Sequence, residues 1–384
     1  MGSVVGAGGR IRRRLVEWRA SRIEDPVRKL RYLRSAMAEK RGGREARPLW
    51  RAVLLAGLAV LAGPLPTVSD GIPAPLELRI PPRGPIFGTP AKPPAVWLVE
   101  ETRSHELYSN GLRIETRYEI ANEERRYPVF DRETLELVGW RTRPAGIVYH
   151  TTESQQAPFA PDYAPRLQRV GKWLLEYVQR KRAYHYVIDR FGRVHRVVRE
   201  SDSANHAGFS VWADDRYVYV NLNPSFIGVA FEAGTRASAA GPEVNPAQIR
   251  AAAMLTEMLR SRYGIPAGNC VAHAQVSVFS RSMRVGNHVD WAARLPFGDL
   301  GLTDNYGIPN PAVAVFGFRY GPDYVKATGP ELWKGLVLGE NLFRQAAAFH
   351  GLPVEEYRRQ RQKRYREILE MVQRASAGEQ RSGV

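Results

Sequence analysis

The sequence predicts an α/β domain around one β-sheet, preceded by a small β extension and followed by a helical extension. Strand-like segments alternate with two amphipathic helical patterns between residues 145 and 264, which is typical of an α/β domain. Shorter alternating stretches come before residue 142, whereas residues 331–374 follow a helical pattern. The chain has 384 residues, of which 44% are hydrophobic, so it can bury such a core, and disorder throughout is excluded.

The first 51 residues form a basic segment ahead of an uncharged run. They contain fifteen Lys and Arg residues against five Asp and Glu residues, within a chain of net charge +17. The run covers residues 52–69, and its strongly apolar part is AVLLAGLAVLA. This length fits either a signal peptide or a membrane anchor. Positive charge directly before an apolar run usually sets membrane topology, so we prefer this interpretation to nucleic-acid binding.

Both interpretations carry residues from about 70 onward across a membrane. We therefore expect an extracytoplasmic location, in the periplasm or cell envelope, for a chain that is secreted or anchored. A start at Met37 would shorten the basic leader to the size of an ordinary signal peptide, and N-terminal sequencing of the natural product would test this. Residues 70–96 are rich in proline, which predicts an extended linker.

Residues 97–141 are expected to form the small β extension. Within it, the stretch LRIETRYEI alternates in polarity and follows a turn signal at Asn110-Gly111. At the other end of the chain, residues 301–384 are expected to form the helical extension. Its last helix carries six basic residues from Arg358 to Arg366, which we interpret as a solvated helix face.

The main domain, residues 142–300, opens with the strand-like segment AGIVYH. YHYVIDRFGRVHRVV predicts two strands joined by a turn at Phe191-Gly192, and FIGVAFEAG predicts another strand. Asn245-Pro246 supplies an N-cap and a first-turn proline for a helix that ends at Gly264. Between the first two strands, apolar residues at three- and four-residue steps predict an amphipathic helix: Leu167, Val170, Trp173, Leu174, Tyr177 and Val178.

Histidine and aspartate are the candidate metal ligands. The chain has one cysteine, Cys270, so it forms no intramolecular disulfide, and we interpret this residue as a small buried side chain. His150 ends the strand IVYH and can project from the sheet end into a cleft. His273 follows CVA, and His288 stands two residues before Asp290.

Residues 144–300 resemble the type 2 N-acetylmuramoyl-L-alanine amidase family, which shares its fold with the peptidoglycan recognition proteins. The matching pieces, in order, are IVYHTTES, AYHYVIDRFGRVH, NHAGFS, NPSFIGVAFEAG, VAH and HVDWAARLPF. The resemblance implies a mixed central β-sheet flanked by helices, with one zinc ion (Zn2+) in a surface groove. By position, its ligands are His150, His273 and Asp290. Three protein ligands leave the fourth tetrahedral position for water, as in catalytic zinc sites.

The resemblance also implies zinc-dependent hydrolysis of the amide bond between N-acetylmuramic acid and L-alanine in peptidoglycan. Tyr184 matches a functional tyrosine of some members, bacteriophage amidases among them, although packing within the sheet also explains it. His288 falls where many members have lysine, and both side chains would stabilise the oxyanion or move a proton. The acidic residue of the family's IGxE strand is replaced by Ala230, so Glu232, which faces the same side, is expected to assist.

His206, in NHAGFS, matches a family histidine near the substrate groove, and Trp212 is expected to stack on a sugar or peptide, although loop structure explains both equally well. The implied partner is peptidoglycan or its fragments, with membrane association through the N-terminal segment and no nucleic acid. The alternative function is a non-catalytic peptidoglycan-binding module of the same fold. Retention of all three ligand positions favours the enzyme. A basic membrane-surface or nucleic-acid protein would leave the ordered motifs unexplained.

Overall fold

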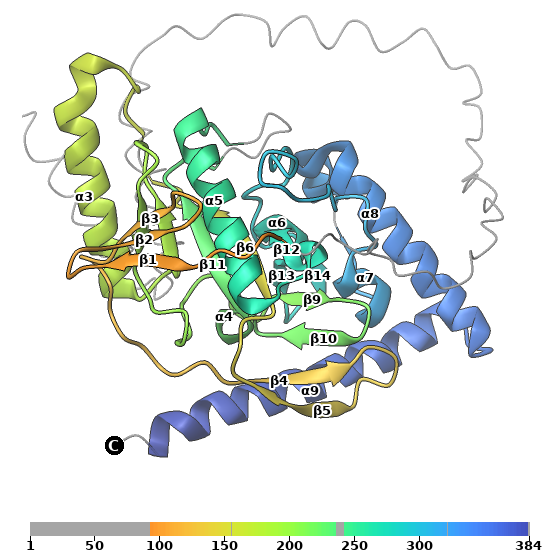
Figure 1. The fold of residues 1–384 in the computed structure, drawn as a ribbon. Coiled ribbons are helices and arrows are strands. Elements are labelled where there is room, and N and C mark those ends of the chain that lie inside the picture. Colours follow the sequence, from red (N-terminus) through yellow and green to blue (C-terminus); the bar gives the residue numbers. More distant parts are fainter. Residues whose placement is uncertain (1–92, 155, 236–241, 321, 383–384) are drawn as a thin grey trace, which may run out of the picture. The chain divides into compact units, whose positions relative to one another are not determined.

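The computed structural model of the chain describes residues 93–154, 156–235, 242–320 and 322–382 (Figure 1). The predicted basic segment, apolar run and nearly all of the linker lie outside the described residues. Within the described ranges, no helix is both long and apolar enough to cross a membrane.

An eight-stranded mixed sheet forms the centre, in the order β1-β2-β3-β8-β7-β11-β6-β12. Strand β11 lies between β6 and β7 and runs parallel to both, whereas β7 and β8 form an antiparallel pair. This mixed sheet confirms the predicted fold class. The strands are β1 Leu98–Glu101, β2 His105–Tyr108, β3 Arg113–Glu115, β6 Gly146–Thr151, β7 Tyr186–Ile188, β8 Val194–Arg196, β11 Phe226–Phe231 and β12 Cys270–Ala272.

Helices α3 (Ala164–Lys181) and α5 (Pro246–Tyr263) cover opposite faces of this sheet (Figure 1). In β7, Tyr186 and Ile188 pack in the same core cluster as α5, whereas Val187 packs with α3. The alternation follows from the two-residue period of a strand. Helix α5 begins at the predicted N-cap, where the Asn245 side chain accepts from the backbone N–H groups of Ala247 and Gln248.

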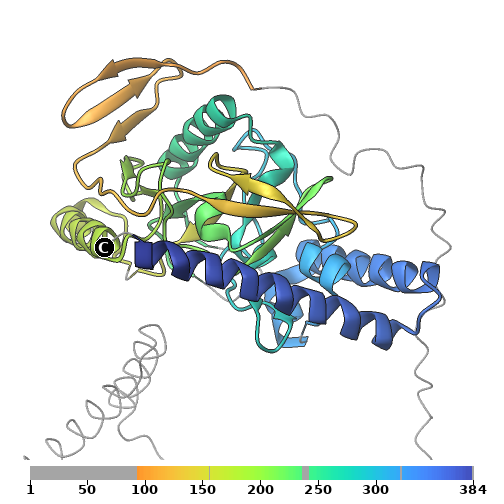
Figure 2. The same cartoon turned by 90° about the horizontal axis from the view of Figure 1, so that it is seen from below.

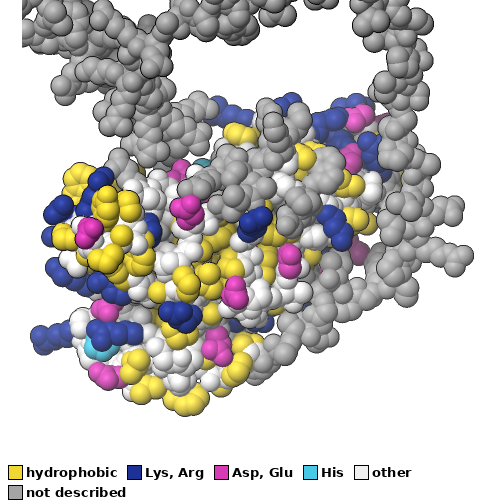
Figure 3. All heavy atoms as spheres, turned by 90° about the horizontal axis from the view of Figure 1, so that it is seen from above, with side chains coloured by type: hydrophobic (Ala, Val, Ile, Leu, Met, Phe, Trp, Pro, Cys, Tyr) yellow, Lys and Arg dark blue, Asp and Glu magenta, His cyan; other side chains and the backbone are white. Residues whose placement is uncertain are grey.

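The buried face of α3 differs from the predicted one. Trp173 is 80% exposed, and Tyr177 is also exposed. Gly171 and Leu175 are buried in their place. An ideal Cβ on Gly171 would lie 3.6 Å from the Glu232 carboxylate, an ordinary van der Waals distance, so this part of α3 packs directly against Glu232. From above, hydrophobic side chains lie exposed among Lys and Arg side chains on this surface (Figure 3).

The predicted β extension contributes strands to two sheets. Strands β1, β2 and β3 extend the central sheet, and β2 and β3 join at the predicted Asn110-Gly111 turn, where Gly111 has a φ of 84°. The other two strands enter a second sheet of order β5-β4-β10-β9 (Figure 2). Its members are β4 Tyr127–Asp131, β5 Leu137–Arg141, β9 Val211–Ala213 and β10 Tyr217–Val220.

Helices follow residue 300, as predicted. They are α7 Pro311–Phe316, α8 Pro322–Phe349 and α9 Val354–Ser382. Helix α9 contacts α7, α8 and strand β10 (Figure 2). The interpretation of its basic cluster as wholly solvated is wrong for Arg358, which is 3% exposed and donates to the Gly317 carbonyl oxygen and to Glu340. A buried guanidinium needs such partners, so this end of α9 is fixed to the preceding helices.

The remaining elements of the described residues are short helices and strands. They are η2 Pro161–Tyr163, α4 Leu222–Ser225, η3 Ala267–Asn269, α6 His273–Val276, β13 Val278–Phe279 and β14 Arg284–Val285. The segment VSVFSRSMRVGN, which lengthens the interval between His273 and Asp290, forms the antiparallel β13–β14 pair.

Candidate metal centre

Three predicted ligands converge at the end of the central sheet. His150 stands near the end of β6, His273 begins α6 directly after β12, and Asp290 lies in the loop after β14. Since β6 and β12 are parallel neighbours, their carboxyl ends bring the two histidines together. All three side chains are buried.

The spacing of the ligand atoms fits a tetrahedral metal. His273 Nδ1 lies 2.9 Å from Asp290 Oδ1, and His150 Nδ1 lies 3.4 Å from Asp290 Oδ2. Ligand atoms about 2.0 Å from a tetrahedral zinc lie about 3.3 Å from one another. Two imidazole nitrogens and one carboxylate oxygen are also a donor set that zinc prefers. The residues therefore fit a zinc ion.

The electrostatics of the site favour the protonation states that a metal requires. Burial, followed by the charge of His273, lowers the pKa of His150 to about 4, so its imidazole is neutral at neutral pH. Burial would raise the pKa of Asp290, but the neighbouring His273 holds it well below its ordinary value. A neutral imidazole and an ionised carboxylate are the forms that bind metal.

His206 lies behind His150 and determines which imidazole nitrogen carries the proton. His206 Nε2 lies 3.2 Å from the Phe226 carbonyl oxygen, which only accepts, so this nitrogen carries the hydrogen. In the neutral ring His206 Nδ1 is then an acceptor, and it accepts a hydrogen bond from His150 Nε2 at 3.1 Å. The lone pair of His150 Nδ1 is left for the metal.

Gly228 in β11 makes room for this arrangement. An ideal Cβ on Gly228 would lie 2.6 Å from the ring of His206. Burial, followed by the charge of His150, holds the pKa of His206 well below its ordinary value, so the ring is neutral. The structure thus gives His206 a contact with a candidate ligand, where the resemblance suggested a contact with substrate.

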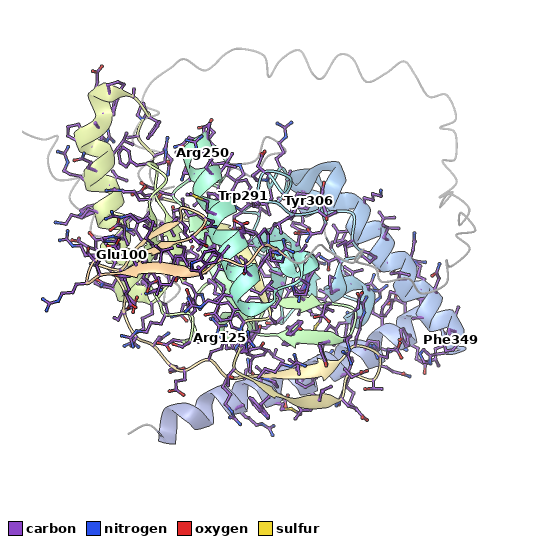
Figure 4. All side chains as sticks on the ribbon, in the orientation of Figure 1. Glu100, Arg125, Arg250, Trp291, Tyr306 and Phe349 are labelled. Carbon is purple, nitrogen blue, oxygen red and sulfur yellow. The ribbon has the colours of Figure 1, made fainter. Side chains whose placement is uncertain are left out.

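Buried hydrogen bonds from aromatic side chains stabilise the backbone next to the three candidate ligands. Trp291 Nε1 donates to the His150 carbonyl oxygen at 3.1 Å, and Tyr306 donates to the Trp291 carbonyl oxygen at 2.6 Å; both aromatic residues are labelled in Figure 4. Tyr324, in α8, donates to the Ala274 carbonyl oxygen at 2.5 Å, next to His273. The C-terminal extension therefore supports the loop that carries two candidate ligands.

Tyr184 and His288 both lie beside the three ligands. The Tyr184 ring centre is 5.2 Å from that of His150, and the His288 ring stacks on His273 with centres 4.6 Å apart. Burial, followed by the negative charge of Asp290, raises the pKa of Tyr184 far above its ordinary value. Its hydroxyl therefore keeps its proton at neutral pH and can donate a hydrogen bond.

Glu232 faces the same side of the sheet as Ala230, as predicted. Its carboxylate, however, contacts the β7–β8 turn and α3. Its Oε2 accepts from the Arg190 backbone N–H at 3.0 Å, and the carboxylate packs against Gly171. Burial raises the pKa of Glu232 to about 7. These contacts place the Glu232 carboxylate against the β7–β8 turn and α3.

The structure corrects the expectation for Trp212. This side chain is 1% exposed, packs in a core cluster with Val148 and Phe226, and donates to the Asn269 side chain at 3.0 Å. It is a core residue and does not stack on a substrate. Cys270, by contrast, is buried as predicted, burial raises the pKa of its thiol to about 12, and neither group of candidate metal ligands among the described residues includes it.

Glu153 joins the site although its sequence context did not single it out. One carboxylate oxygen of Glu153, one ring nitrogen of His288 and one carboxylate oxygen of Asp290 lie within 4.8 Å of one another. Glu153 is exposed, and His288 is half-buried. The sequence feature that could have identified Glu153 is its position three residues after His150 in IVYHTTES.

Comparison with known proteins agrees with the motifs. Residues 140–290, which include all three candidate ligands, match the family model described as N-acetylmuramoyl-L-alanine amidase. This match confirms the resemblance. No curated protein matches the chain.

Several solved structures are similar to parts of this chain. The amidase AmiD from E. coli, solved with anhydro-N-acetylmuramic acid-L-Ala-D-γ-Glu-L-Lys, is 27% identical over 35% of this chain, with a TM-score of 0.27. The chain spans about half of AmiD, 49% of its length. AmpDh3 from Pseudomonas aeruginosa, solved with an anhydromuramic pentapeptide, is 23% identical over 45% of this chain and 68% of its own, with a TM-score of 0.32.

Proposed function

We propose that this chain is a zinc-dependent N-acetylmuramoyl-L-alanine amidase, which hydrolyses the amide bond between N-acetylmuramic acid and L-alanine in peptidoglycan. The observation that carries the proposal is the convergence of His150, His273 and Asp290 within a domain that matches this family. The solved structures of AmiD and AmpDh3 contain anhydromuramyl peptides, which supports peptidoglycan or its fragments as the partner.

The two histidines and Asp290 would hold the metal ion. When bound there, zinc would polarise the amide carbonyl and activate a water molecule as nucleophile. His206 keeps His150 in the tautomer whose Nδ1 is free to bind. The three ligand atoms lie within 4.8 Å of one another, and all three side chains are buried.

Tyr184 and His288 suit the charge that develops at the reacting carbonyl. As water adds to the carbonyl carbon, its oxygen becomes negative, and the neutral hydroxyl of Tyr184 is a donor beside the ligands. The His288 ring stacks on that of His273, so a ring nitrogen of His288 is also close to the ligands. The leaving nitrogen of L-alanine must also receive a proton before the C–N bond breaks, so the site needs a group that carries one.

Digestion of purified peptidoglycan, with and without a zinc chelator, tests the reaction. Mass spectrometry should detect free stem peptides that begin with L-alanine, and the chelator should abolish them. Binding to peptidoglycan without any released peptide would instead identify a non-catalytic binding module.

The location outside the cytoplasm is part of the same proposal. It is supported by the basic residues that precede the uncharged run 52–69, and by a substrate that belongs to the cell wall. A reporter fused after residue 96 should be active outside the cytoplasm. Activity inside only would contradict the topology and any membrane association through this segment.

A further inference from the structure

We propose that Glu153 is the carboxylate that accepts and returns the proton during amide hydrolysis, in place of the acidic side chain that is missing at Ala230. This inference rests on the proposed function and goes beyond it by naming the proton carrier. Neither the sequence motifs nor the three-ligand set assigns any role to Glu153.

The position of Ala230 explains why another carboxylate is needed. Ala230 pairs directly with His150 across β11 and β6, so the two side chains lie on the same face of the sheet. Its methyl group packs in an apolar cluster with α3 and cannot carry a proton. Glu232, two residues later, is engaged by the Arg190 backbone and lies against Gly171.

Glu153 brings a carboxylate to the site from a different element. It lies in the loop after β6, which ends at Thr151, and its oxygen, the His288 ring nitrogen and the Asp290 oxygen lie within 4.8 Å of one another. Its negative charge is also close enough to act on the Tyr184 hydroxyl. Glu153 is therefore near both side chains that suit the developing oxyanion.

The exposure of Glu153 separates its role from that of a metal ligand. The three candidate ligands are buried side chains on or next to the strand ends, whereas Glu153 is exposed. Its backbone φ of 50° is in the left-handed region, which turns the chain sharply after β6. An exposed carboxylate at the edge of a buried site can reach both solvent and the reacting atoms, as a proton carrier must.

Glu153 alone can carry out both proton transfers of the hydrolysis. The Glu153 carboxylate accepts a proton from the attacking water as the water oxygen forms its bond to the lactyl carbonyl carbon. The carbonyl electron pair moves onto its oxygen, where the Tyr184 hydroxyl donates. When the C–N bond breaks, Glu153 returns the proton to the nitrogen of L-alanine, and the carboxylate is regenerated. The products are the muramic acid carboxyl group and the free amine of the stem peptide.

Glu153→Gln, Glu153→Asp and the control Glu176→Gln test the proposal in the full chain. Glu176 is on α3, and its carboxylate pairs with Lys172. We expect Glu153→Gln to lower kcat on a soluble muramyl peptide by about 100-fold or more, with KM nearly unchanged. Glu153→Asp should retain part of the activity because it keeps a carboxylate, and Glu176→Gln should match the original chain. Each variant should hold one zinc per chain, with unchanged zinc affinity in competition with a chelator.

A second variant tests the replacement directly. Adding Ala230→Glu to Glu153→Gln returns a carboxylate to the residue paired with His150, and should raise kcat at least about 10-fold above Glu153→Gln alone. A folded, zinc-loaded double variant without recovery would contradict the idea that the two positions serve one purpose. Where the double variant fails to fold, the comparison of Glu153→Gln with Glu153→Asp decides.

Three outcomes would overturn the inference. Glu153→Gln with full zinc and kcat within about 3-fold of the original chain would remove Glu153 from the chemistry. Loss of zinc from Glu153→Gln would make it a ligand instead. An original chain that holds zinc but releases no stem peptide would remove the proposed function, and this inference with it, whereas activity that persists in Glu153→Gln removes this inference alone.

Discussion

Replacing Glu232 with Gln should stabilise the fold above neutral pH while leaving catalysis nearly intact. The carboxylate of Glu232 is 2% exposed, and burial raises its pKa to about 7 from an ordinary value of 4.5. In the unfolded chain the group loses its proton near pH 4.5, whereas in the folded chain it holds the proton to about pH 7. Folding is therefore opposed once the pH rises through this window.

The sign and size of the effect follow from proton binding. Between pH 4.5 and 7 the folded state binds more protons at Glu232 than the unfolded state, so the free energy of unfolding falls as pH rises. Each tenfold difference in proton affinity is worth about 1.4 kcal/mol, so ionised Glu232 costs at most about 3.5 kcal/mol at pH 8. Gln cannot ionise, but its amide oxygen can still accept from the Arg190 backbone.

Urea denaturation of the original chain and Glu232→Gln at pH 4.5, 6 and 8 measures the effect. The two proteins should have similar stability at pH 4.5, and Glu232→Gln should be more stable by roughly 1–3 kcal/mol at pH 8. Glu176→Gln, a substitution on the exposed side of α3, should show no such trend. A stability difference that does not change with pH would refute the electrostatic reasoning. A zinc-loaded but inactive Glu232→Gln would instead make Glu232 the proton carrier.

Three further substitutions test the other parts of the site. Asp290→Ala should abolish zinc binding and turnover, and full zinc occupancy by elemental analysis with normal activity would reject the ligand assignment. His206→Ala should weaken zinc affinity by about 10–100-fold in chelator competition, because His150 loses the acceptor that fixes its tautomer; unchanged affinity would contradict that role. His288→Ala should lower kcat by about 100-fold with zinc still bound, and nearly normal kcat would show that His288 is not part of the chemistry.

The sequence was sufficient for the features that depend on local pattern. The β6 strand, the β7–β8 pair and helix α5 with its Asn245 cap all follow from alternation or from capping residues that act over a few positions. The ligand set was available because the motifs that carry His150, His273 and Asp290 lie in a recognisable order. Their convergence depends on parallel pairing of strands, which those motifs already imply for this fold.

Features that depend on packing between distant segments were not predictable. Trp212 lies in a sequence that suits an exposed loop, yet contacts from β6 and Asn269 bury it. Trp173 fits the helical period of α3, but the packed helix buries Gly171 and Leu175 and leaves Trp173 exposed. The contact between His206 and His150 joins residues 56 positions apart and depends on Gly228, so no local pattern contains it.

The zinc requirement of the reaction is the central claim, and a metal titration measures it directly. Metal-free protein is titrated with zinc while the release of stem peptides with a free L-alanine amine is followed. We predict that activity is absent without metal, rises in proportion to added zinc and saturates at one zinc per chain. Full activity in the metal-free protein, or no released peptide at one bound zinc per chain, would contradict the claim.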